Sequence, residues 1–130
     1  MSYQNQSNLE IQSFPLTVSS AGQIVSSVSQ RTKIEYKKIK GVAILSNGVF
    51  AAKDVQGSIA IELNKKRIIS PDYFPKNALE ITNSIAMYVA AHPVDIDINT
   101  SDVDITFKDE SPALGFEAYK VIVMFLCEKR

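Results

Sequence analysis

Residues 118–127, AYKVIVMFLC, contain the longest apolar run in the chain and decide its fold class. Side chains alternate along a strand, so one face of this run would carry Val121, Val123, Phe125 and Cys127. The other face would carry Ile122, Met124 and Leu126. Because both faces are apolar, the strand is expected to lie centrally in a packed sandwich, or to be covered on its outer face by another chain. The seven residues from Val121 to Cys127 are too few to cross a bilayer as a helix, which takes about 20.

The composition is that of an ordinary globular domain. The 130 residues fit one domain, and 14 basic residues balance 14 acidic ones, so no net field attracts nucleic acid or membranes. A single cysteine, Cys127, excludes an internal disulfide and is expected to be buried rather than reactive. Residues 1–8 are polar and predict a flexible arm without a signal peptide, followed by one domain over residues 9–130. Folding in a reducing cytoplasm is expected.

Alternating apolar residues predict further strands. Residues 9–18 predict an edge strand interrupted at Pro15, where a missing N–H is tolerated. Residues 31–37 and 57–63 alternate clearly, and residues 67–70 predict a strand that stops at Pro71. The Ser-rich residues 19–30 predict a loop or a weak strand draped over the body, with a short helix as the alternative.

The second half of the chain contains the clearest alternation. Residues 94–108 predict a hairpin with one apolar and one acidic face, followed by a loop over residues 108–117. Residues 71–75 are expected to plug one end of a sandwich, and residues 83–91 fit a strand better than a helix. Eight or nine short strands predict an all-β fold, a single antiparallel β-sandwich or jelly roll.

Four aspartates of the predicted hairpin are candidate ligands of a Ca²⁺ ion. Like charges opposite each other destabilise a sheet, and a calcium ion bound by carboxylate oxygens would relieve them. The candidate residues are Asp95, Asp97, Asp102 and Asp104. A solvated acidic face is the simpler interpretation. Two such carboxylates could also serve a glycosidase, but nothing in the sequence indicates a cleft.

Basic residues gather between positions 31 and 40. Arg31, Lys33 and Lys37 have the same parity, so a strand would place them on one face. An ordinary solvated face is expected, with packaged nucleic acid, acidic lipids or the acidic hairpin of a neighbouring copy as alternative contacts. No aromatic residues interleave with these charges, so specific nucleic-acid binding is not expected.

No constellation of residues suggests an enzyme. His92 is the only histidine and precedes Pro93, which makes a structural role more plausible than a catalytic or zinc-binding one. The chain has no nucleophile elbow, P-loop or dinucleotide fingerprint. No catalytic activity, cofactor or transmembrane segment is therefore expected.

Four stretches occur in an order that resembles a known family. They are GVAILSN at residues 41–47, RIISP at 67–71, YFP at 73–75 and the apolar final strand. The order is similar to that of the small single jelly-roll penton, or vertex, proteins of tailless icosahedral bacteriophages of the tectivirus type. Asp72 stands where that family has a glycine.

The resemblance implies a structural protein of the virion that assembles in the host cytoplasm. A homopentamer would fill the five-fold vertices and contact a major capsid protein, with a spike protein as a further partner. Minor capsid or spike-base roles are alternatives within this class. A carbohydrate- or receptor-binding sandwich, assisted by Ca²⁺, is the alternative from another class.

The expected interface follows from the last strand. The alternating strands supply enough apolar residues to cover one of its faces: Ile59, Ile61, Leu63, Val94, Ile96, Ile98, Val103, Ile105 and Phe107. No comparable set is evident for the other face. Ile122, Met124 and Leu126 are therefore expected to be covered by the Ser-rich N-terminal segment or by another subunit. Tyr73 and Phe74 are further interface candidates.

Overall fold

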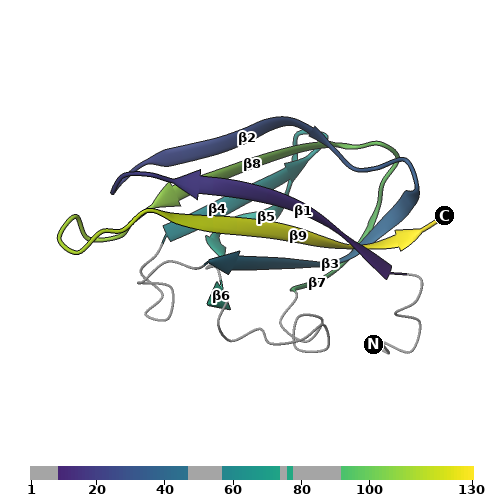
Figure 1. Ribbon diagram of the computed structural model, residues 1–130. Helices are drawn as coiled ribbons and strands as arrows, with labels where there is room; N and C mark the ends of the chain where they lie inside the picture. Colours follow the sequence, from purple (N-terminus) through teal and green to yellow (C-terminus); the bar gives the residue numbers. More distant parts are fainter. Residues whose placement is uncertain (1–8, 47–56, 74–75, 78–91) are drawn as a thin grey trace.

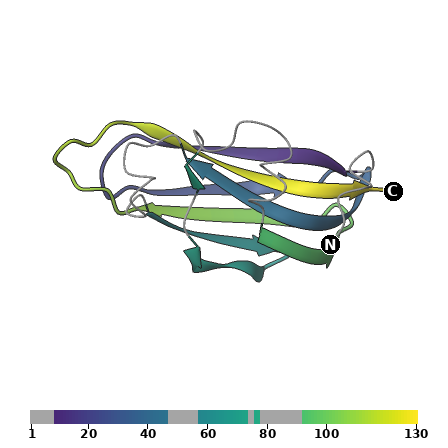
Figure 2. The same ribbon diagram turned by 90° about the horizontal axis from the view of Figure 1, so that it is seen from below.

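Two β-sheets pack face to face in the computed structural model, which describes residues 9–46, 57–73, 76–77 and 92–130 (Figure 1). The described residues form nine strands and no helix. Figure 2, seen from below, shows the two layers one above the other. The predicted all-β sandwich is confirmed, whereas the jelly roll stays a prediction.

Sheet A is built around the apolar C-terminal strand. The order of its strands is β1 (Leu9–Val18), β9 (Tyr119–Lys129) and β3 (Tyr36–Ser46). Two strands share the far edge of β3: β7 (His92–Asp97) pairs antiparallel with its first part, and the short β6 (Lys76–Asn77) pairs parallel with its end. The central position predicted for the last strand is thus confirmed. Strand β1 is the expected edge strand with Pro15 exposed, but it is not interrupted there, since Pro15 lies opposite Ile122 in an unbroken register.

Sheet B contains the remaining four strands. Their order is β2 (Ile24–Arg31), β8 (Asp102–Asp109), β4 (Gly57–Leu63) and β5 (Lys66–Tyr73). The β4–β5 turn places Asn64 and Lys65 at φ angles of 49° and 68°. Positive φ at both central residues is the geometry of the tight turns that match the twist of a hairpin.

The antiparallel pairs are nested along the chain. Strand β1 pairs with β9, β2 with β8, β3 with β7, and β4 with β5. Two further pairs, β3 with β9 and β4 with β8, complete the two sheets. The two halves of the chain therefore run side by side, with successive pairs alternating between sheet A and sheet B.

The core lies between the sheets and takes one face of strands from both of them. Its largest fully buried side chains include Phe107 and Phe125. The Phe14 and Phe125 rings meet edge to face with centroids 5.1 Å apart, which joins β1 to β9. Each such aliphatic or aromatic side chain contributes roughly 1.5–3 kcal/mol when fully buried.

The predicted hairpin over residues 94–108 is wrong. Strand β7 lies in sheet A and β8 in sheet B, so residues 98–101 carry the chain from one sheet to the other. Both strands still turn their apolar residues to the same core, as Ile96 and Ile105 do. Alternation reports which face of a strand is buried, but it does not report which sheet the strand joins.

The predicted strand over residues 31–37 is also wrong. Strand β2 ends at Arg31, and residues 32–35 turn into β3, with the Tyr36 N–H donating to the Lys33 carbonyl at 3.1 Å. The Ser101 N–H donates to the Thr32 hydroxyl at 2.8 Å, so this turn is tied to the turn between β7 and β8. Ile34 is consequently 73% exposed.

Two other expectations need correction. Strand β5 continues through Pro71 to Tyr73, because it is an edge strand and can lack one donor. Residues 24–31 of the Ser-rich stretch form a strand of sheet B, with a register shift between Ser27 and Gln30, instead of draping over the body. Predictions for residues 1–8, 74–75 and 83–91 lie outside the described residues.

Candidate functional site

The outer face of sheet A carries an apolar surface made of three cross-strand rows. The register places Leu126 between Ile11 and Gly41, Met124 between Ser13 and Ala43, and Ile122 between Pro15 and Leu45. We call this surface the sheet A patch. Residues in such rows are direct neighbours on one face of the sheet, so the patch is continuous across β1, β9 and β3.

The centre of the patch is as inaccessible as a core. Leu126 and Ala43 are 2% and 1% exposed, although neither belongs to the core cluster between the sheets. Ile122 and Met124 are half-buried, and Ile11 on the edge strand is 37% exposed. The residues of the patch are therefore buried on β3, and their exposure to solvent increases towards β1.

The structure brings three of the five predicted interface residues together. Ile122, Met124 and Leu126 share the outer face of sheet A as expected, and their role in an interface stays a prediction. Tyr73 ends β5 in the other sheet, and Phe74 lies outside the described residues. The Ser-rich strand β2 belongs to sheet B, so it is not the predicted cover of this face.

Sequence reasoning missed the contribution of β3 and β1 to the patch. Residues 42–45 read VAIL, and such a run is apolar on both faces of a strand, like the run in β9. This signal could have indicated a second strand with an apolar outer face. What the sequence could not supply was the register that aligns Ala43 with Met124.

The structure separates the four candidate calcium ligands. Asp95 and Asp97 lie on β7 in sheet A, whereas Asp102 and Asp104 lie on β8 in sheet B. Among the described residues, no group of three or more His, Cys, Asp or Glu side chains lies close enough to hold a metal ion. The opposed aspartates that motivated a calcium site therefore do not occur.

Two of these aspartates instead meet the predicted basic residues of β3. The Lys38 ammonium lies 3.2 Å from Asp95 and 3.1 Å from Asp97, and Lys40 lies 3.3 Å from Asp95. Hydrogen bonds from Lys38 and then Lys40 lower the pKa of the Asp95 carboxyl. The hydrogen bonds that Lys38 donates to Asp97 and Asp95 raise the pKa of the Lys38 ammonium.

The other predicted basic residues do not form a common stripe. Arg31 pairs with Asp102 at 3.0 Å in sheet B, and Lys37 pairs with Glu128 at 3.1 Å in sheet A. Lys33 lies in the turn between them. Charges that were considered as alternative contacts between copies, such as Arg31 and Asp102, thus pair within one chain.

Asp109 forms a buried polar network that the sequence did not suggest. One carboxylate oxygen accepts hydrogen bonds from the Gly22 N–H at 2.8 Å and the Ser111 N–H at 3.2 Å. The other accepts from the Ser111 hydroxyl at 2.6 Å and the Tyr119 hydroxyl at 2.5 Å. Burial by itself would raise the pKa of Asp109, but these hydrogen bonds lower it. The network ties the end of β8 to the start of β9 and supports the loop between them.

Cys127 is buried in the core as predicted, and burial raises the pKa of its thiol to about 12. A thiol at this pKa remains protonated at neutral pH and is a poor nucleophile.

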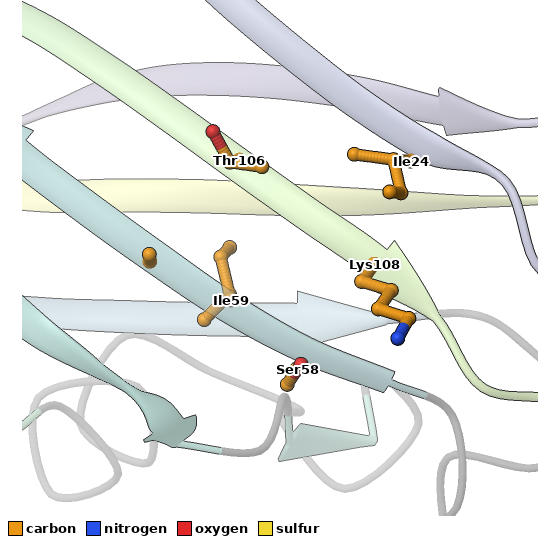
Figure 3. Close-up of a pocket in the computed structure, with 6 residues that line it drawn as sticks. Ile24, Ser58, Ile59, Thr106 and Lys108 are labelled. Carbon is orange, nitrogen blue, oxygen red and sulfur yellow. The ribbon is translucent and has the colours of Figure 1, made fainter.

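The hollows between described residues include two that can be described by their lining. A shallow hollow of about 270 Å³ lies on sheet B between β2, β8 and β4 (Figure 3). Lys108 is the only charged residue among those that line it. A second hollow of about 330 Å³ lies where β7 of sheet A approaches the β4–β5 turn. Catalysis by acid and base would need titratable groups converging in such a cleft.

The large hydrophobic residues exposed in the described part of the chain are all aliphatic: Ile11, Ile24, Ile34 and Leu114. A row of exposed aromatic rings, as sugar-binding surfaces use, is therefore missing among the residues whose side chains are described. The described residues also include no helix that could span a membrane. Comparison of the chain with protein-family models, with curated proteins and with solved structures finds no match.

Proposed function

We propose that this chain is a structural protein of a virus particle, folded as a jelly roll, that associates with copies of itself at the five-fold vertices. The nested strand pairing supports the jelly roll, because rolling up one long antiparallel hairpin produces this set of pairs. Jelly rolls of two four-stranded sheets are frequent in viral capsid domains, and they also occur in lectins. The resemblance in residues 41–47 and 67–75 favours the capsid class.

The observation that carries self-association is the sheet A patch. Apolar rows on three adjacent strands are unusual on the outer face of a soluble sheet, which is normally polar. The patch opens towards β1, and β1 has its second edge free of pairing among the described strands. Contact between copies would remove both the apolar margin and the strand edge from water.

The ring follows from these properties together with the resemblance. Five copies around a vertex would each present the β1 side of the patch to a neighbour. In a closed ring every copy makes the same contacts, so each patch is covered by a neighbour and no apolar surface is left for further growth. A major capsid protein would contact the outside of this ring, and a spike protein would be a further partner at the vertex.

Light scattering coupled to size exclusion tests this proposal. The wild-type chain is expected to elute as an assembly of five 14.4-kDa chains. Met124→Lys places a charge at the centre of the half-buried row, so it is expected to give a folded monomer. Thr106→Lys is the matched control, because Thr106 is an exposed outward residue of the central strand β8 in sheet B.

A wild-type chain that stays monomeric at every concentration would contradict the proposal. So would a Met124→Lys variant that keeps the wild-type assembly. Circular dichroism and thermal melting of both variants separate a lost interface from a lost fold.

A further inference from the structure

The loop between β8 and β9, which we call the tip loop (residues 110–118), extends beyond the ends of the strands in both ribbon views (Figures 1 and 2). Leu114 lies in this loop and is 92% exposed, more than any other large hydrophobic residue described. Gly115 follows at a φ of +82°, and the Phe116 N–H donates to the Ala113 carbonyl at 3.3 Å. A tight turn therefore presents the leucine to solvent.

The base of the tip loop is fixed on both sides. Ser111 is held by the buried Asp109, and the Phe116 ring packs edge to face on Tyr119 with centroids 6.1 Å apart. Tyr119 itself donates to Asp109. Because its base is ordered in advance, binding through this loop loses little conformational entropy, as a preorganised contact requires.

The hollow near the β4–β5 turn, which we call the end hollow, lies at the opposite end of β8. Ser101 lines this hollow just before β8 begins, and the tip loop starts just after β8 ends at Asp109. Eight residues of strand separate the two, or about 25 Å at 3.3 Å per residue. Leu63, Ile68 and Ile96 give the hollow an apolar floor, and its volume of about 330 Å³ accommodates a leucine side chain.

The charges at the two ends are opposite in sign. Glu110 and Glu117 flank the exposed leucine, and neither forms an ion pair with a described residue. Lys66 lines the end hollow and Lys65 precedes it in the turn, again without an ion-pair partner among the described residues. Asp97, the acidic residue of the hollow, is already paired with Lys38.

We propose that the tip loop of one copy binds the end hollow of the next, with Leu114 in the hollow and Glu110 and Glu117 facing Lys65 and Lys66. This inference rests on the proposed self-association and names a contact that would orient the copies. A contact between two different surfaces is heterologous, so it passes from copy to copy and closes into a ring when the rotation permits. It would act beside the sheet A patch, with the patch providing area and the tip loop fixing direction.

The test uses light scattering to compare the assembly of two variants, each of which replaces one exposed aliphatic side chain by serine. Leu114→Ser is expected to raise the dissociation constant of the assembly by roughly 30-fold or more, as the loss of a buried apolar anchor does. Ile24→Ser is the control, because Ile24 is 62% exposed but lies outside the tip loop, at the start of β2 opposite Lys108. Since Leu114 is almost fully exposed, both variants should melt at the wild-type temperature.

Charge reversal provides a second test that does not depend on the leucine. Changing Glu110 and Glu117 to lysine, or Lys65 and Lys66 to glutamate, places like charges at both ends and is expected to weaken assembly. The chain that carries all four changes restores opposite charges and is expected to recover it.

Each failure points to a different conclusion. If wild-type protein assembles and Leu114→Ser assembles equally well, or if Ile24→Ser is equally harmful, the tip-loop contact is overturned while the proposed self-association stands. The contact would also be overturned if each pair of charge changes alone weakened assembly but the variant with all four changes did not regain it. If the wild-type chain never assembles, both proposals fail.

Discussion

The outer faces of the two sheets differ although their inner faces are alike. On sheet A, the central strand β9 presents Ile122, Met124 and Leu126 outward, and Leu126 is 2% exposed. On sheet B, the central strand β8 presents Thr106 and Lys108, both exposed. One sheet is thus apolar on both sides, whereas the other has the polar outer face of a water-exposed sheet.

This difference shows what alternation along a strand does and does not report. A clean alternation, as in β4 and β8, marks a strand with one side in the core and the other in water. Loss of alternation, as in the second half of β3 and in β9, marks a strand that is covered twice. Because its outer face is also apolar, sheet A is the side of the molecule where contacts beyond the core are expected.

The strongest test of the comparison places the same charge at the centre of each outer face. Leu126→Asp is expected to lower the free energy of unfolding by about 3 kcal/mol or more, because a carboxylate would be desolvated without a partner. Thr106→Asp is expected to change it by less than about 0.5 kcal/mol. Denaturant unfolding of the two variants measures both values. Equal effects would mean that the two outer faces do not differ as described.

A smaller effect is expected where the two sheets are tied together. Asp109 at the end of β8 accepts a hydrogen bond from Tyr119 at the start of β9. Asp109→Asn replaces one accepting oxygen by a donor, so it is expected to cost about 2 kcal/mol at neutral pH. Asn is a better replacement than Ala because it has nearly the same volume as Asp, so the variant tests the loss of the negative charge without creating a cavity.

The pH dependence of this variant has a defined sign. The pKa of Asp109 is lowered in the folded protein, so the carboxylate stabilises the fold above its unfolded pKa of about 3.9. This contribution is lost as the pH falls through the folded pKa. The stability difference between wild type and Asp109→Asn should therefore be constant near neutrality and shrink in acid. A difference that stays constant into strong acid would contradict the charged network.

The sequence predicted the faces of most strands but not their partners. Ile59, Ile61 and Leu63 are buried as their alternation indicates, and Pro15 lies on an edge strand as its missing donor requires. Strand partners depend on contacts between residues far apart in the chain, which a local period cannot report. The predicted hairpin failed for this reason, since β7 pairs with β3, fifty or more residues away.

The candidate site was predictable to a similar degree. The outer apolar residues of β9 were recognised from parity, whereas their neighbours Ala43 and Leu45 depend on the register of β3. Asp109 was not recognised, because a carboxylate at the end of a strand has the same local pattern whether it is solvated or buried. Its burial comes from Gly22 and Tyr119, which the fold brings to it.

The smallest expected effects concern one acidic residue on each sheet, Asp95 on β7 and Asp104 on β8. Asp95→Asn removes ion pairs with Lys38 and Lys40, and is expected to lower the melting temperature by about 2 °C. Hydrogen bonds from Lys38 and Lys40 lower the pKa of Asp95, so its contribution should be present above about pH 4 and disappear in acid. About 1 M salt should also remove most of it by screening.

Asp104→Asn is the matched change on sheet B and is expected to act in the opposite direction. Asp104 lies directly opposite Glu62 on β4 and forms no ion pair with a described residue. Like charges opposite each other destabilise a sheet, so removing one should leave the melting temperature unchanged or raise it slightly. Arg67, 3.8 Å from Glu62, offsets part of this repulsion and keeps the gain small. If both variants shift the melting temperature equally and in the same direction, the ion pairs on β3 and β7 do not distinguish Asp95 from Asp104.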